Sequence, residues 1–250
     1  MDDGTLLAVL HETVDAVARA LGGLDDWGLA GTRPGQYRSD MAADAAAVAV
    51  LERAGLGVLS EETGLHHADR PLLAVVDPVD GSTNASYRLP WYATSVCVLD
   101  ARGARAAVVA NQASGVRYEA VRDGGARRDG TPVSPTACTE LGDALVGLNG
   151  LPPAHLGWRQ FRCLGAAALD LCAVADGSLD AYVDCTVDSH GPWDYLGGML
   201  VCREAGALVA DATGRDLVAR GPLDRRTPIA AASGPLLAAL AAARARDSHQ

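Results

Sequence analysis

The chain has 250 residues, a length that suits one large domain or two closely packed small ones. Hydrophobic residues make up 49% and charged residues 21%, ordinary globular proportions that leave little room for long disordered segments. All 21 basic residues are arginines, so Schiff-base lysine chemistry, the Walker-type phosphate loop and the kinase lysine are excluded. The formal net charge of −10 argues against a protein that coats nucleic acid, and it fits a protein that binds divalent cations better.

The cysteines and the N-terminus both indicate a cellular compartment. Six widely spaced cysteines form no C-x-x-C pair, which predicts buried free thiols in a reducing compartment rather than disulfides or a zinc site. The acidic N-terminus lacks the pattern of a signal peptide, and no apolar run approaches the roughly 18 residues that span a bilayer. We therefore expect a cytoplasmic protein with no membrane partner.

The first part of the chain predicts two helices followed by strands. Apolar residues at spacings of three and four predict an amphipathic helix over residues 5–22, and an alanine-rich stretch predicts a second helix from Asp40 to Ala54, after a Gly/Pro/Arg loop at 31–35. Short apolar runs then predict strands at residues 57–59, 72–76, 94–99 and 106–110. The run 72–76 is apolar throughout, which predicts a central strand that delivers Asp77 at its C-terminal end.

Beyond Thr136 the pattern alternates between strand and helix, which predicts a layered α/β second half. The expected strands are residues 145–148, 181–183 and 207–209, and the expected helices are 166–175, 195–205 and 236–245, the last followed by a polar tail. Prolines and turn-forming residues between Pro132 and Thr139 predict a boundary there. We expect an N-terminal α+β half over residues 1–135 and a C-terminal α/β half over residues 136–250.

The segment from Asp77 to Asn84 carries the strongest chemical signal. In the sequence D-P-V-D-G-S-T-N, the proline and the glycine permit a tight bend that aims Asp77 and Asp80 at one point. If a helix begins at Gly81-Ser82-Thr83, its first amides would hold a phosphate. The alternative is a plain turn in which both aspartates cap or solvate a loop.

Two further acidic groups stand at the ends of predicted elements. Glu61 and Glu62 follow an apolar strand, and Asp194 in G-P-W-D opens a helix. Each has a simpler explanation, an exposed acidic turn for the first and a residue that complements the helix dipole for the second. Together the three groups supply the oxygen ligands that Mg²⁺ prefers, without the histidine and cysteine set that favours zinc.

These motifs, in this order and spacing, resemble the inositol monophosphatase family over roughly residues 5–240. The resemblance rests on Glu61-Glu62, the D-P-V-D-G-S-T-N segment, P-W-D with its glycine-rich helix and E-A-G-A at residues 204–207, and two connecting segments, R-C-L-G-A-A-A at 162–168 and V-A-D-G-S-L-D-A-Y at 174–182. It implies the layered α-β-α-β-α sandwich shared with the fructose-bisphosphatases. It also implies Mg²⁺-dependent hydrolysis of a small phosphomonoester, sensitivity to lithium and a homodimer.

The resemblance further implies two to three Mg²⁺ ions and a set of site residues. Glu61, Asp77 and the Val79 carbonyl would hold one ion; Asp77, Asp80 and Asp194 a second; a third, weaker ion would lie near Glu61. Glu61, Ser82 and Asp44 are the expected catalytic residues, with the Ser82 hydroxyl, supported by Asp44, positioning the attacking water. The expected substrate-binding residues are Asp80, Gly81, Ser82, Thr83, Ala167, Asp184 and Asp194.

The chain departs from the family pattern at two places. The stretch Tyr37–Asp44 keeps its last acid but lacks the family's threonine. The loop from Val183 to His190 looks longer than the family's inositol-contacting segment, and there Asp184 or Asp188 could contact sugar hydroxyls or simply face solvent. His190 could likewise face the substrate or lie on the surface.

We therefore expect a Mg²⁺-dependent phosphatase with inositol monophosphate as the first expected substrate. The alternatives are a specialised sugar-phosphate phosphatase of a biosynthetic pathway and a non-catalytic regulator with the same fold. A phosphoryl-aspartate mechanism is disfavoured, because the chain has D-x-x-D rather than D-x-D and no lysine. No basic stripe indicates a nucleic-acid partner.

Overall fold

The structure is a computed structural model that describes residues 1–31 and 36–247. Most of the predicted loop at residues 31–35 and the end of the predicted polar tail lie outside the described residues. No helix in the described ranges combines the length and the apolarity needed to cross a bilayer. Cys97, Cys172 and Cys202 are buried free thiols, whereas the free thiol of Cys163 is exposed.

The first sheet has eight described strands in the order β2-β1-β3-β4-β5-β6-β7-β8. β1 and β3 are parallel, and the other neighbouring strands are antiparallel. The strands are β1 (Gly57–Ser60), β2 (Gly64–His66), β3 (Leu73–Asp80), β4 (Ala93–Asp100), β5 (Gly103–Asn111), β6 (Arg117–Val121), β7 (Gly125–Arg128) and β8 (Thr131–Pro132). A five-residue helix, α3 (Ser82–Ser86), follows β3.

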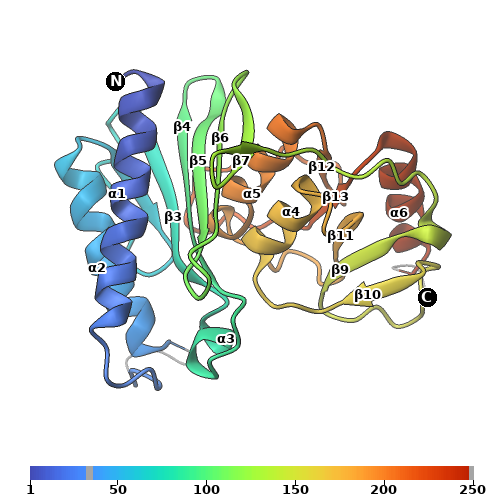
Figure 1. Cartoon of the computed structure of the whole chain (residues 1–250), viewed down its shortest axis with the longest axis horizontal. Coiled ribbons are helices and arrows are strands. Elements are labelled where there is room, and N and C mark those ends of the chain that lie inside the picture. Colours follow the sequence, from blue (N-terminus) through green and yellow to red (C-terminus); the bar gives the residue numbers. More distant parts are fainter. Residues whose placement is uncertain (32–35, 248–250) are drawn as a thin grey trace.

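Two N-terminal helices, α1 (Asp3–Gly22) and α2 (Arg38–Arg53), cover one face of this sheet (Figure 1). Leu6, Leu10 and Val14 of α1 are fully or almost fully buried, as the helical spacing predicts. α1 begins earlier than expected, because the Asp2 carboxylate accepts a hydrogen bond from the Thr5 amide and caps the helix. α2 begins at Arg38 rather than at Asp40.

The second sheet has the order β10-β9-β11-β13-β12. Its strands are β9 (Leu145–Asn149), β10 (Gln160–Arg162), β11 (Ala181–Asp184), β12 (Leu208–Asp211) and β13 (Pro228–Ala231), preceded by the short 3-10 helix η1 (Leu141–Asp143). α4 (Ala167–Ala175) and α5 (Pro192–Ala205) lie between the two sheets, and α6 (Gly234–Asp247) covers the outer face (Figure 1). The predicted α-β-α-β-α sandwich is therefore confirmed.

The predicted central strand is confirmed, with a longer extent. β3 lies between β1 and β4, and all eight of its residues are buried. It continues past residue 76 to include Asp77 and Asp80, and its pairing with β4 shifts between these two residues. Pro78 has no N–H to contribute to the ladder, so the irregularity falls where the sequence predicts a bend.

Several strands were not predicted from the sequence. β6, β7 and β8 form the far edge of the first sheet, and β10 and β13 belong to the second. β7 and β10 are only four and three residues long, and arginines interrupt their apolar pattern. Strands this short gain their stability from neighbouring strands, which local sequence does not reveal.

The contact between α4 and α5 depends on glycine at position 198. A methyl group on Gly198 would lie 2.6 Å from the Leu171 Cβ and 2.8 Å from the Ala168 carbonyl oxygen. We expect Gly198→Ala to lower the free energy of unfolding by about 1–3 kcal/mol, because the two helices must separate to admit the methyl group. Urea denaturation followed by circular dichroism would measure this loss.

Gly22→Ala is the matched control, because no described atom outside its own helix backbone and its chain neighbours lies within 4 Å of the added methyl group. This substitution near the end of α1 should be neutral or slightly stabilising. Equal losses in the two variants would contradict the close-contact explanation.

Candidate metal centre

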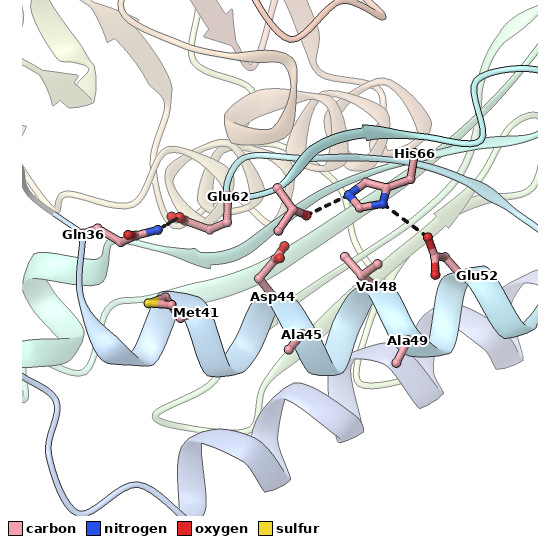
Figure 2. Close-up of a pocket in the computed structure, with 10 residues that line it drawn as sticks. Gln36, Met41, Asp44, Ala45, Val48, Ala49, Glu52, Glu62 and His66 are labelled. Carbon is pink, nitrogen blue, oxygen red and sulfur yellow. Dashed lines mark hydrogen bonds and ion pairs between the residues drawn. The ribbon is translucent and has the colours of Figure 1, made fainter. Parts of the chain in front are cut away.

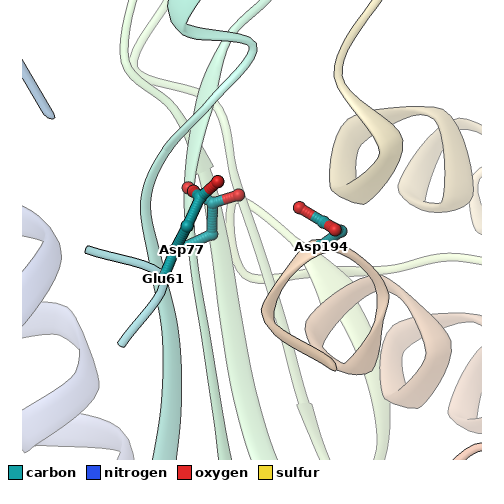
Figure 3. Close-up of side chains that lie close together, drawn as sticks. All are labelled: Glu61, Asp77 and Asp194. Atoms are coloured by element: carbon teal, nitrogen blue, oxygen red, sulfur yellow. The ribbon is translucent and has the colours of Figure 1, made fainter. Parts of the chain in front are cut away.

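Three carboxylates from different elements meet at one end of the first sheet. Glu61 directly follows β1, Asp77 lies in β3, and Asp194 lies in the first turn of α5. One oxygen from each residue lies within 4.8 Å of the corresponding oxygens of the other two, as Figure 3 illustrates. The spacing and all-oxygen composition of this acidic triad suit a hard cation such as Mg²⁺.

The backbone explains why these acids converge. Ser60 pairs with Val76 in the parallel register of β1 and β3. Glu61 and Asp77 are the next residues along the chain, so they lie side by side at the same end of the sheet. Asp194 is the third helical residue of α5, and its Oδ2 accepts a hydrogen bond of 2.6 Å from the Gly191 amide. The proline at the first position of α5 favours a helix start there. That start places Asp194 where its carboxylate caps the helix and also faces the other two acids.

Crowding in a buried site raises the pKa of each acid. Burial raises the pKa of Asp77 well above its ordinary value, and the negative charge of Glu61 adds to the shift. Glu61 keeps an exposed side chain, but protein atoms around its carboxylate, followed by the charge of Asp194, raise its pKa to about 8. Burial also raises the pKa of Asp194. A divalent cation would relieve this repulsion, so the acidic triad fits the predicted metal.

Asp80 lies beside the triad but has its own hydrogen-bond partners. Its two oxygens accept hydrogen bonds from the Ala167 and Ala168 amides, at 3.3 Å and 2.7 Å. Burial raises its pKa well above the ordinary value, with the charge of Asp194 as the next cause. Asp80 thus joins the end of β3 to the N-terminus of α4, and it places the predicted substrate contact Ala167 against a predicted metal ligand.

The segment from Val79 to Thr83 turns as predicted. The Val79 amide donates to Asp77 Oδ1 at 3.0 Å, and the Val79 carbonyl accepts from the Ser82 hydroxyl at 2.9 Å. Gly81 has a left-handed φ of +87°, and a Cβ there would lie 3.0 Å from the Gly165 carbonyl oxygen. α3 then begins at Ser82, so the amides of Ser82 and Thr83 belong to its first turn, where helical amides lack partners within the helix.

The structure brings Asp40, rather than Asp44, to Ser82. Burial raises the pKa of Asp40, and the hydrogen bond from the Tyr37 amide, with the nearby Ser82 side chain, partly offsets the rise. Asp44 lies one turn further along α2, where it accepts a hydrogen bond from the Ser60 hydroxyl. The pairing of Ser82 with Asp44 expected from the sequence is therefore corrected, because the packing of α2 places Asp44 against Ser60 and brings Asp40 to the cavity that Ser82 lines.

Asp184 is also placed differently from the expectation. It is fully buried, and its oxygens accept hydrogen bonds from the Asn149 side chain at 3.0 Å, the Thr186 amide at 2.9 Å and the Ser189 hydroxyl at 2.7 Å. Asp184 thus supports the pocket wall rather than presenting free oxygens to a substrate. Asp188 instead forms an ion pair with Arg215.

His190 lies in the interior and not on the surface. Its Nδ1 lies 2.9 Å from Asp184 Oδ2, and its Nε2 lies 3.2 Å from the Tyr182 hydroxyl. Burial lowers its pKa, but the hydrogen bond with Asp184 and the charge of Asp194 outweigh burial and raise the pKa above the ordinary value. His190 therefore joins a buried hydrogen-bond network with Tyr182 and Asp184 of β11.

Two cavities open onto the acidic triad and share Glu61. We call the first, of about 460 Å³, the serine-side cavity, because Asp40, Ser60, Glu61 and Ser82 line it together with Trp193 and Arg225. We call the second, of about 370 Å³, the helix-side cavity, and its lining includes Asp80, Ala167, Asp170, His190 and Asp194. A reacting group at the triad would therefore have open space on two sides.

A third cavity, of about 650 Å³ and therefore larger than these two, lies over α2 and is separate from the triad. Figure 2 shows Met41, Asp44, Ala45, Val48, Ala49 and Glu52 along α2, with Glu62 and His66 above the helix. None of Glu61, Asp77 and Asp194 is among the residues that line it. Size alone would have identified the wrong site in this protein.

Asp170 is a site residue that the sequence reasoning missed. It is almost fully buried in α4, accepts a hydrogen bond of 2.8 Å from the Trp91 indole, and lines the helix-side cavity. Burial raises its pKa to about 7. A lone acid within the apolar helix A-A-L-D-L-C-A-V-A is a signal that could have identified it.

The raised pKa values predict how stability without a cation depends on pH. The folded state holds protons that the unfolded chain releases above the ordinary carboxyl pKa of about 4, so the free energy of unfolding should fall as pH rises from about 5 to 8. Mg²⁺ competes with these protons, so its stabilising effect should grow over the same range. Thermal unfolding in a chelator and in Mg²⁺ at several pH values would test this.

Glu61→Gln should reduce both the fall in the free energy of unfolding with rising pH in the chelator and the stabilisation that Mg²⁺ provides. Asp143→Asn is the control, because Asp143 is exposed in η1. A stability that stays constant from pH 5 to 8 in the chelator would contradict the crowding described for the triad.

Comparisons with known proteins agree with this geometry. The model of the inositol monophosphatase family matches residues 38–250. The Nus factor SuhB of Escherichia coli K12 is 30% identical over 229 residues, which cover 84% of this chain and 81% of SuhB. An inositol-1-monophosphatase of Mesorhizobium japonicum is 32% identical, covering 75% of this chain and 77% of the relative.

A solved structure also shares the fold. The inositol monophosphatase of Anabaena superposes with a TM-score of 0.80 at 23% identity, and the alignment covers 97% of this chain and 96% of the Anabaena chain. The family match extends over most of the sequence and includes all three residues of the acidic triad. The chain belongs to the inositol monophosphatase family.

Proposed function

We propose that this protein is a Mg²⁺-dependent phosphatase that hydrolyses a small phosphomonoester, with inositol monophosphate as the first candidate substrate. The observation that carries the proposal is the convergence of Glu61, Asp77 and Asp194 between two cavities. When bound, two to three Mg²⁺ ions would neutralise the phosphoryl oxygens, lower the pKa of the attacking water and stabilise the leaving oxygen. No nucleophilic side chain is then required.

Metal binding is assigned to the acidic triad together with Asp80 and the Val79 carbonyl. The triad supplies three oxygens on its own. Asp80 must keep or exchange its hydrogen bonds with α4 as it contacts a cation. The Val79 carbonyl already accepts from Ser82, so that hydroxyl is held beside the second expected ligand.

Ser82 and Asp40 are assigned to the attacking water. The Ser82 hydroxyl lines the serine-side cavity together with Asp40, and its oxygen can accept a hydrogen bond from water there. Its one proton is donated to the Val79 carbonyl and would have to turn away from it to reach Asp40. Glu61 borders both cavities and can accept a proton at the same site. The amides of Gly81, Ser82 and Thr83, near the first turn of α3, are assigned to the phosphoryl oxygens.

The helix-side cavity is assigned to the alcohol part of the substrate. Asp80, Asp170, Asn149, Tyr182, Ser189 and His190 give it a polar lining suited to hydroxyl groups. Ala167 and Asp194 border the same space, whereas Asp184 positions the loop by accepting a hydrogen bond from the Ser189 hydroxyl. A polyol or sugar phosphate therefore fits this cavity better than an apolar phosphoester.

Phosphate release from a panel of inositol and sugar phosphates, with millimolar Mg²⁺, tests the function. Ratios of kcat/KM across the panel distinguish an inositol phosphatase from a specialised sugar-phosphate phosphatase. Failure to release phosphate from every compound would reject the enzymatic proposal and leave the regulatory alternative. We also propose a cytoplasmic location, lithium inhibition and a homodimer, the last of which sedimentation would test.

Substitutions at Asp40 and Asp44 should have different effects on catalysis. Asp40→Asn and Ser82→Ala should each lower kcat by about 100-fold or more, because the proton acceptor or the hydroxyl beside the water is lost. Ser82→Thr should keep most activity, since it retains the hydroxyl. Steady-state kinetics at saturating Mg²⁺ would measure these changes.

Asp44→Asn serves as the matched control, because it retains an oxygen that can accept the hydrogen bond from Ser60. It should change kcat by about 3-fold or less, as expected for a residue away from the reacting atoms. If Asp44→Asn were as inactive as Asp40→Asn, the assignment of Asp40 would be wrong.

A further inference from the structure

Arg225 lies beside the acidic triad and has no role in the function proposed so far. It belongs to the loop between β12 and β13 and lines the serine-side cavity together with Glu61, Ser82 and Trp193. Its guanidinium lies over the indole of Trp193, with 5.2 Å between the guanidinium carbon and the ring centroid. Trp193 immediately precedes Asp194, so Arg225 is adjacent in space to a predicted metal ligand.

The backbone around Arg225 is held in place on both sides. The Arg226 amide donates to the His190 carbonyl at 2.9 Å, and the His190 amide donates to the Arg226 carbonyl at 3.2 Å. On the other side, Asp224 Oδ2 accepts from the Gly221 amide at 2.8 Å and closes a turn. Arg225 therefore occupies a fixed position near the start of α5.

The guanidinium has unused capacity to bind an anion. Its Nη1 donates to the carbonyl oxygens of Pro222 at 3.1 Å and Asp224 at 2.8 Å. Within the described residues, no carboxylate forms a salt bridge with Arg225, although Asp40, Glu61 and Glu62 line the same cavity. Among the described residues that line this cavity, Arg225 carries the only permanent positive charge.

A phosphoryl group supplies the matching chemistry. In the proposed function, the phosphoryl group lies at the acidic triad. The Ser82 hydroxyl and the Arg225 guanidinium both line the serine-side cavity, so they lie on the same side of that group. A planar guanidinium can donate two parallel hydrogen bonds to two phosphoryl oxygens. Negative charge on these oxygens persists in the transition state of phosphoryl transfer, where a fixed cation stabilises it.

We propose that Arg225 contacts the phosphoryl group of the substrate from the serine-side cavity and is a further substrate-binding residue of this enzyme. This inference rests on the proposed phosphatase function. The stacked indole of Trp193 and the turn at Gly221–Asp224 hold the guanidinium ready before the substrate arrives, which reduces the entropy lost on binding.

The test compares inorganic phosphate binding with turnover. Isothermal titration calorimetry of the Mg²⁺-loaded protein would give the Kd for phosphate, and kinetics would give KM and kcat on the best substrate of the panel. Arg225→Gln should weaken phosphate binding by about 10- to 100-fold, the range for losing a charge-assisted hydrogen bond. KM should rise by a similar factor, and Arg225→Lys should recover part of the loss because it restores the charge without the planar fork.

Arg220→Gln is the matched control, because Arg220 belongs to the same loop but donates to the Asp100 carbonyl, away from the cavity. It should leave phosphate binding and KM unchanged. Thermal unfolding of each variant checks the fold, and Arg225→Lys provides the comparison if the glutamine variant does not fold.

Phosphate binding by Arg225→Gln that equals wild type would overturn the inference, and so would equal weakening in Arg220→Gln. A lower affinity for Mg²⁺ with unchanged affinity for phosphate would also overturn it, because Arg225 would then act only on the acidic triad. If the wild-type protein binds phosphate but hydrolyses no substrate, the proposed function fails while the assignment of Arg225 as an anion-binding residue stands.

Discussion

Electrostatic repulsion among crowded, poorly solvated carboxylates is the constraint on which this site depends. Glu61, Asp77 and Asp194 place their oxygens within 4.8 Å of one another, and Asp80 adds another buried acid beside them. Ionising such a group in a poorly solvated site is costly unless a cation is present. Strand pairing and a helix cap hold each acid in place despite this cost, and a bound divalent cation, as proposed, would relieve the repulsion.

The layered architecture explains how acids from distant parts of the sequence come together. β1 and β3 supply two of them at one end of the first sheet, while α5 lies between the sheets and supplies the third. Gly197 and Gly198 permit the close approach of α5 to β4 and α4, because a Cβ at either position would lie within 2.6 Å of neighbouring atoms. Packing in the interior thus sets the geometry of the metal centre.

The two cavities divide the proposed reaction in space. The serine-side cavity holds the hydroxyl, the nearby Asp40 carboxylate and the arginine, and the helix-side cavity holds polar groups suited to an alcohol. Glu61 borders both, so a phosphoryl group near it would face attacking water on one side and the leaving alcohol on the other. Because the loop from β11 to α5 contributes His190 and Ser189 to the helix-side cavity, changes in that loop would alter substrate choice under the proposed function.

Local sequence determined the features that depend on neighbouring residues. The spacing of Leu6, Leu10 and Val14 determines the buried face of α1, and D-P-V-D-G determines the bend after the central strand.

Tertiary structure alone decided the contacts that cross long stretches of chain. Asp40 and Asp44 lie one turn apart on α2, so spacing cannot select between them, and only the packing of α2 against the sheet places Asp40 at Ser82. The position of Arg225 over Trp193 likewise depends on a loop that packs against a distant helix, which no local pattern encodes.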